Sequence, residues 1–200
     1  MHGRSAVAVF AVLLVAAAAG AENDVRGRVL LDLPGMLLSD LGPIVVYVAA
    51  EPGVTVAAPA AIPSLHQKNA AFLPGFLAIA AGQIVAMPND DMIFHNVFSY
   101  SKPNDFDLGL YAAGESRTLA FKHPGVVKLY CSIHESMNGM IFVSPTPYFD
   151  VADSGGHFAL RGVPPGKHRI RTWNEKLPDT EQTTTVPPSG VSALEISLVP

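Results

Sequence analysis

Short runs of strand-forming residues, separated by proline and glycine, constrain the fold of this chain more than any other feature. From Val25 onward such runs recur at even spacing, with turn signals such as Ala81-Gly82 and Pro124-Gly125 between them. This pattern predicts an all-β chain built from sandwiches or barrels. The expected strands are Val25 to Val29, Pro43 to Val48, Phe76 to Ile79, Gln83 to Met87, Ile93 to Phe98, Arg117 to Phe121, Val126 to Cys131, Met140 to Val143 and Val191 to Val199.

The first 21 residues have a different composition from the rest. Arg4 precedes an apolar run from Ala6 to Ala19, and Ala19-Gly20-Ala21 provides small residues for cleavage before Glu22. These features predict a secretory signal peptide, and hence a periplasmic or secreted protein. The apolar run is short for a membrane span, so an uncleaved anchor is the less favoured alternative. The net charge of −4 is scattered, which argues against a nucleic-acid-binding stripe.

Cys131 is the only cysteine, so an exported form of the chain has no partner for an internal disulfide. His134 and Met137 follow it at intervals of three residues. Thiolate, imidazole and thioether are soft ligands that select copper, and a His2Cys site with a weak axial Met is the blue-copper arrangement. The second histidine has to come from elsewhere, and His95 is the best candidate. The competing interpretations are a small buried cysteine and a structural histidine.

Strand alternation places these groups on buried faces. Cys131 shares its face with Val127 and Leu129, and His95 shares its face with Ile93 and Val97. Met140 is the alternative axial residue, but it opens an apolar strand and is expected in the core. Four further histidines are expected to be surface or structural groups: His66, His123, His157 and His168. Four aspartates are expected to lie in solvated turns: Asp90, Asp91, Asp105 and Asp107.

His95-Asn96-Val97, followed by Cys-x2-His-x2-Met-x-Gly from Cys131, resembles the cupredoxin (type 1 blue copper) family, in particular its amicyanin/plastocyanin-like group. The resemblance covers Leu65 to Ser144, and Ile133 stands where this group usually has proline. It implies a Greek-key sandwich that binds one copper ion. The implied ligands are His95, Cys131, His134 and Met137.

The same resemblance implies a one-electron carrier rather than an enzyme. Its partners would be redox proteins such as a c-type cytochrome or a quinoprotein dehydrogenase, as in methylamine utilization. It also implies that the Asn96 amide ties the His95 strand to the ligand loop near Ser132. Two other functions stay open at this point: a copper storage or delivery protein with the same ligands, and a structural envelope module with a vestigial site.

A second resemblance is carried by the run Gly156-x-Phe158-x-Leu160-x-x-Val163-Pro164-Pro165-Gly166. This run is similar to one in the carboxypeptidase-regulatory-like, transthyretin-type β-sandwich. Gly155 to Trp173 is expected to form a hairpin. Four segments are predicted: a signal peptide (1–21), an N-terminal β segment (22–61), the cupredoxin domain (62–147) and a C-terminal β segment (148–200). The N-terminal and C-terminal segments are expected to form one small sandwich with the cupredoxin domain inserted into it. Alternatively, the N-terminal strands extend the cupredoxin sheet.

Overall fold

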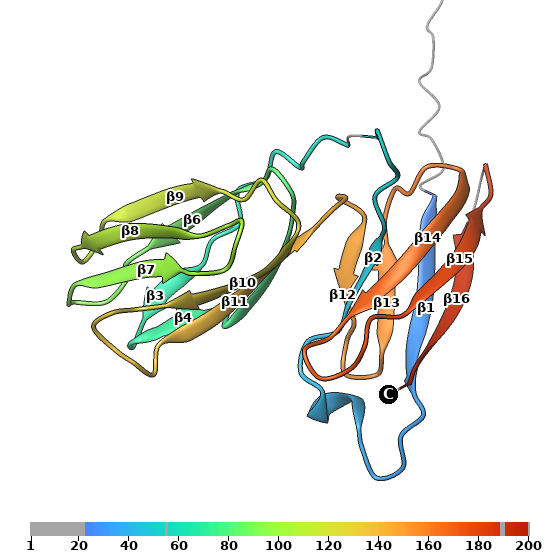
Figure 1. Cartoon of the computed structure of the whole chain (residues 1–200), viewed down its shortest axis with the longest axis horizontal. Helices are drawn as coiled ribbons and strands as arrows, with labels where there is room; N and C mark the ends of the chain where they lie inside the picture. Colours follow the sequence, from blue (N-terminus) through green and yellow to red (C-terminus); the bar gives the residue numbers. More distant parts are fainter. Residues whose placement is uncertain (1–22, 55, 189–190, 200) are drawn as a thin grey trace, which may run out of the picture.

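The computed structural model describes residues 23–54, 56–188 and 191–199. Within these ranges the chain forms sixteen β-strands and one 3-10 helix, η1 (Leu38–Asp40). The strands build two sandwiches that lie side by side (Figure 1). The predicted all-β fold class is confirmed. The predicted signal peptide at residues 1–21 lies outside the described residues.

The inner sandwich comprises the contiguous chain from β3 (His66–Lys68) to β11 (Asn138–Ser144). A five-stranded sheet of order β5-β11-β10-β7-β8 packs against two ladders, β3-β4 and β6-β9. An apolar core that includes the fully buried Val85, Val127 and Ile141 fills the space between them. The other strands are β4 (Ala71–Leu73), β5 (Phe76–Ala80), β6 (Ile84–Pro88), β7 (His95–Ser99), β8 (Phe106–Tyr111), β9 (Ser116–Ala120) and β10 (Gly125–Tyr130).

The flanking sandwich combines strands from both ends of the described chain. In one sheet, β1 pairs antiparallel with β13 and parallel with β16. The other sheet has the order β12-β2-β14-β15. The chain therefore leaves this sandwich after β2, forms the inner sandwich and returns at β12. The strands are β1 (Asp24–Leu31), β2 (Val45–Val48), β12 (Phe149–Val151), β13 (His157–Leu160), β14 (Gly166–Trp173), β15 (Glu181–Val186) and β16 (Val191–Leu198).

Side-chain alternation explains the core of the flanking sandwich. In β16, Leu194, Ile196 and Leu198 are buried, whereas the residues between them are exposed, because successive side chains of a strand point to opposite faces. Val25 and Val29 of β1 belong to the same core. β1 and β2 thus pair with the C-terminal strands and do not extend the inner sheet. The exact domain boundaries at residues 62 and 147 stay predictions.

The predicted hairpin between Gly155 and Trp173 is wrong. β13 belongs to the sheet of β1, and β14 belongs to the opposite sheet. Val163 in the connection is fully buried in the core between these sheets, so the chain crosses from one sheet to the other. Pro164 and Pro165 follow, and they lack the N–H groups that a tight hairpin ladder uses.

Aromatic side chains join the two sandwiches. Phe142 of β11 lies with its ring centroid 5.4 Å from that of Tyr47 in β2 and 5.1 Å from that of Trp173 in β14. Across the same junction, the Thr146 hydroxyl donates a hydrogen bond of 2.8 Å to the Val48 carbonyl. The outer face of the inner sheet is therefore covered at β11 by the flanking sandwich.

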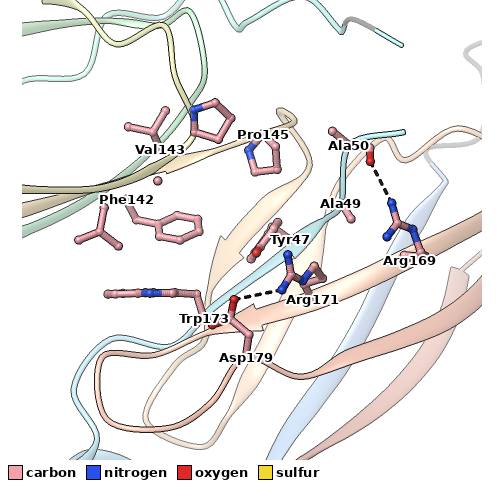
Figure 2. A pocket seen from close by; sticks show the side chains of 13 residues that line it. Tyr47, Ala49, Ala50, Phe142, Val143, Pro145, Arg169, Arg171, Trp173 and Asp179 are labelled. Atoms are coloured by element: carbon pink, nitrogen blue, oxygen red, sulfur yellow. Dashed lines mark hydrogen bonds and ion pairs between the residues drawn. The ribbon is translucent and has the colours of Figure 1, made fainter. Parts of the chain in front are cut away.

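A hollow of about 390 Å³ opens beside this junction (Figure 2). Trp173 and Tyr47 line it together with two arginines. Arg171 donates to the Asp179 carboxylate at 3.2 Å, and Arg169 donates to the Ala50 carbonyl at 3.1 Å. The positive charges at the hollow are thus engaged within the chain.

Among the helices of the described ranges, none combines the length and the apolar character needed to cross a membrane.

Candidate metal centre

His95 is the first residue of β7, and its side chain is fully buried. The strand was expected to start at Ile93, but Ile93 is outside it and 48% exposed. The reason is Asn89, whose side-chain amide donates to the carbonyls of Ile93 (2.8 Å) and Tyr111 (3.1 Å) and holds the preceding loop away from the ladder. The buried face of β7 therefore begins with the imidazole, and Val97 shares its burial.

Cys131 follows β10 directly and is 5% exposed. Its Sγ lies 3.7 Å from Nδ1 of His95, although 36 residues separate the two in the chain. Burial raises the pKa of the Cys131 thiol, but the backbone N–H groups of Asn96, His134 and Ile133 outweigh burial and lower the pKa below its usual value. The thiolate, which is the form that binds metals, is stabilised here.

The loop brings His134 to the same point. Its imidazole centroid is 5.0 Å from that of His95. One donor atom each from His95, Cys131 and His134 lies within 4.8 Å of the other two. Nδ1 of His134 is buried and has no hydrogen-bond partner among the described residues. An unpaired buried nitrogen is costly, so its place beside a thiol and a second imidazole fits a metal ligand.

The structure distinguishes the two candidate axial residues. Met137 is 1% exposed and belongs to the same apolar core as Cys131, and its N–H donates to the His134 carbonyl at 2.9 Å. Met140 pairs with Lys128 across β10 and β11, so it lies on the face opposite to Cys131. The expectation that Met140 lies in the core is wrong. Axial ligation by Met137 stays a prediction, and this placement favours it.

Asn96 ties the two ligand-bearing segments together. Its Oδ1 accepts hydrogen bonds from the backbone N–H and the hydroxyl of Ser132, both at 2.8 Å. Its Nδ2 donates to Asp107 at 3.4 Å. The predicted link between the His95 strand and the Cys131 loop is confirmed by these contacts. Bonds of this kind orient metal ligands.

Asp91 was expected in a solvated turn, and this expectation is wrong. Its carboxylate is 13% exposed, and Oδ2 lies 2.7 Å from Nε2 of His95. The N–H of Ala70 lowers the pKa of Asp91 most, burial opposes this, and the bonds to His95 and to the N–H of Asn69 lower it further. The sequence signal was only a carboxylate four residues before a histidine, which is too common to identify such a contact.

The other four histidines of the described ranges, His66, His123, His157 and His168, are not part of this cluster. His66 is half-exposed and lies 2.6 Å from the Asp90 carboxylate. His157 contacts Asp153, and His168 lies against a backbone carbonyl. Among the His, Cys, Asp and Glu side chains of the described ranges, only His95, Cys131 and His134 form a group of three or more with ligand atoms close enough to share a metal ion. A thiol, two imidazoles and a nearby thioether form the donor set that suits copper.

No protein-family model matches the chain, and no curated protein matches it. Among solved structures, a purple cupredoxin from Nitrosopumilus maritimus is 26% identical, with 41% of this chain and 99% of that one covered and a TM-score of 0.38. A reduced amicyanin variant is 17% identical, with 50% and 98% covered and a TM-score of 0.39.

A copper-containing nitrite reductase from Thermus scotoductus is 22% identical, with a TM-score of 0.40. The match covers 57% of this chain and only 28% of the reductase. Because these TM-scores lie below 0.5, the similarities carry no weight for function. Function has to be inferred from the side chains themselves.

Proposed function

We propose that this chain is an exported type 1 copper protein that carries single electrons between redox partners and catalyses no reaction of its own. The observation that supports it most is the convergence of three donor atoms from His95, Cys131 and His134, all within 4.8 Å of one another. The unpartnered, buried Nδ1 of His134 adds to it. We expect Met137 to complete the set as a weak axial ligand.

Bound copper would supply one reversible electron through its cuprous and cupric states. The protein's contribution is to keep the ligands in place, because ligand movement slows electron transfer. His95 is fully buried at the start of a strand, Cys131 is 5% exposed, and Asn96 bonds their segments together. These contacts support a centre with little reorganisation. Such burial also argues against the rapid copper hand-over that a delivery protein needs.

An exit for electrons is proposed at His134. It is partly exposed, and its neighbour Ile133 is 50% exposed. Met92 and Phe94, on the loop that leads into His95, are 92% and 59% exposed. Exposed apolar side chains next to ligands are suited to brief docking of another protein. A c-type cytochrome or a quinoprotein dehydrogenase is the proposed partner, and a periplasmic or secreted location is the proposed setting.

The test is to add Cu(II) to the purified protein and to record its visible and electron paramagnetic resonance spectra. We expect one copper per chain, an intense blue band and a narrow copper hyperfine splitting. Replacing His134 by Gly should remove the band, and added imidazole should restore it because this ligand is reached from solvent. His157→Ala, at an exposed histidine of β13 in the flanking sandwich, is the matched control and should change nothing.

Failure to bind copper would refute the proposal and leave a structural module. A bound copper that shows no reversible voltammetry, but passes readily to a chelator, would instead indicate storage or delivery. A copper spectrum that His157→Ala abolishes and His134→Gly preserves would place the metal elsewhere.

A further inference from the structure

The β3–β4 hairpin supplies no candidate ligand, yet it contacts two residues that lie close to candidate ligands, Asp91 and Gly139. Its strands are joined by Asn69 and Ala70, whose φ angles are 54° and 52°. Two successive left-handed residues form the type I′ turn that suits a two-residue hairpin. Alanine is strained in this region, so the turn needs support from its surroundings.

That support comes from the Asp91 carboxylate. The N–H of Asn69 donates to Oδ1 at 2.6 Å, and the N–H of Ala70 donates to Oδ2 at 2.9 Å. The same Oδ2 lies 2.7 Å from Nε2 of His95. Because a carboxylate accepts hydrogen bonds, Nε2 has to carry the imidazole proton. The lone pair of a neutral His95 is then on Nδ1, which faces the Cys131 sulfur at 3.7 Å.

The second contact is made by Phe72 of β4, which is 2% exposed. Gly139, two residues after Met137, lies against this ring. A Cβ added to Gly139 would be 3.1 Å and 3.2 Å from two Phe72 carbons, closer than ordinary contact allows. The chain leaving the ligand loop is therefore seated directly on the hairpin, and Phe72 and Met137 belong to one core.

The hairpin is itself firmly attached. Gln67 of β3 is fully buried, and its carbonyl accepts a bond of 2.9 Å from the Asp90 N–H. Its side-chain amide contacts the Tyr111 hydroxyl, which donates to the Met87 carbonyl at 2.9 Å. Gln67 thus binds the hairpin to the loop before His95 through its carbonyl, and to Tyr111 of β8 through its buried side chain.

We propose that the β3–β4 hairpin is a positioning element of the metal centre. Through Asp91 it fixes the tautomer and orientation of His95, and through Phe72 it fixes the backbone that follows Met137. Its effect on copper rests on the proposed function, whereas its hold on the His95 imidazole does not. Asp91 is a positioning residue that acts through His95.

The first test replaces Asp91 by Asn in the metal-free protein. The amide keeps the shape but has one oxygen, so it cannot accept all three hydrogen bonds. Nitrogen NMR of the wild type should show His95 protonated at Nε2, with slowly exchanging Asn69 and Ala70 amides. The variant should lose the Nε2 preference and expose both amides to exchange. Asp105→Asn is the matched control, since it removes the same charge from an exposed carboxylate that pairs with Lys102 rather than with the hairpin, and it should keep all these signals.

The copper-loaded proteins give the second readout. Loss of an outer bond to a metal-bound histidine typically costs 10–100-fold in affinity. A tenfold loss confined to Cu(II) raises a one-electron potential by about 59 mV. We expect such losses in Asp91→Asn, with no change in Asp105→Asn. Gly139→Ala, which presses on Phe72, should shift the potential while the His95 Nε2 signal stays unchanged.

The outcomes separate the two proposals. An Asp91→Asn variant that keeps the His95 tautomer, the protected amides and the wild-type copper affinity overturns the positioning role. A Gly139→Ala variant with an unaltered potential overturns the Phe72 part. If the wild type binds no copper, the copper function fails, and the metal-free NMR comparison still decides whether the hairpin controls His95.

Discussion

The two sandwiches of this chain share an architecture and differ in what they bury. The core of the flanking sandwich consists of aliphatic side chains and Phe158. The core of the inner sandwich contains Cys131 and Met137, and it adjoins His95, which is fully buried. Burying groups that can bind metals costs stability unless they gain partners. The flanking core thus contains only groups that contribute to stability, whereas the inner core also contains groups that are able to bind a metal.

In the flanking sandwich, the buried side chains of Asp24 and Asn174 have partners within the chain, whereas Asn23 Oδ1 and Arg171 Nε have no hydrogen-bond partner among the described residues. Asp24 accepts from Arg26 at 3.0 Å, and the Asn174 amide donates to the Pro43 carbonyl at 2.9 Å. In the inner sandwich, Oε1 of Gln67 and Nδ1 of the partly buried His134 have no such partner among the described residues, and of these two atoms only the His134 nitrogen belongs to a side chain of the His95, Cys131 and His134 cluster. Substitutions in the two regions should therefore affect different properties.

The largest expected effect is that of Cys131→Ser. The blue band of the copper protein should disappear completely, because it depends on the thiolate. The unfolding free energy of the metal-free protein should change by less than about 2 kcal/mol, as for most single substitutions. Visible spectra and urea unfolding measure the two quantities. A blue band that survives would refute the ligand assignment.

Gly27→Ala should lower the unfolding free energy and leave the blue band of the folded protein unchanged. An added Cβ would lie 2.1 Å from the Leu194 carbonyl oxygen and 2.5 Å from the Phe158 ring. Overpacking of this kind costs about 3 kcal/mol, so the flanking sandwich should unfold at lower denaturant while the folded fraction stays blue. Gly75→Ala is the control, since its nearest atom would be 3.9 Å away. An equal loss in both variants would contradict this account.

Met137→Leu sharpens the comparison inside the inner core. A leucine fills similar volume, so stability should fall by less than about 1.5 kcal/mol. The blue colour should persist and the reduction potential should rise, because a weak axial ligand tunes the potential. Met140→Leu, on the outer face of the sheet, should leave the potential unchanged. If the two variants exchanged these effects, Met140 would be the axial residue.

Acid should reveal a stabilising carboxylate in the flanking sandwich. The hydrogen bond from Arg26 lowers the pKa of Asp24, burial opposes this, and the Gly162 N–H lowers it further. A lowered pKa means that Asp24 stabilises the fold above its unfolded pKa of about 3.9, and that this stability is lost as pH falls through the folded pKa.

Unfolding of the metal-free protein between pH 2 and pH 7 tests this. Asp24→Asn should be less stable than the wild type at neutral pH, and the gap should narrow in acid. A gap that is constant across this range would show that the charge of Asp24 contributes nothing.

The smallest effect is expected at the ion pair between the sandwiches. Lys128 Nζ lies 3.0 Å from Glu175, and both side chains are about half-exposed. Glu175→Gln should cost at most about 0.5 kcal/mol, and high salt should remove the difference. A cost well above 1 kcal/mol would mean that this pair, rather than the aromatic contacts of Phe142, holds the sandwiches together.

The sequence predicted best what depends on local pattern. Alternation placed Val127, Leu129 and Cys131 on one face, and the structure buries all three. The hairpin of β3 and β4 was missed because Asn69-Ala70 lacks the glycine that usually marks such a turn. β8 was missed as well, since Gly109 interrupts it and several of its residues are exposed.

What the sequence could not predict depends on contacts between distant segments. Asp91 resembles any turn carboxylate until the Asn69 and Ala70 amides are seen to point at it. Met140 looked like a core residue because it begins an apolar run, and only its pairing with Lys128 shows that it faces outward. Periodicity determines faces within a strand, whereas long-range pairing determines which face meets which core.

The pairing of β1 with β16 also bears on how the protein is made. Val25 lies beside Ser192, so β1 has to wait for β16, which is synthesised more than 150 residues later, before its sheet can close. The inner sandwich is continuous in the chain, and it can fold earlier, while β1 still lacks this neighbour. On a nascent chain we therefore expect the inner sandwich to fold first and the flanking sandwich to complete the fold.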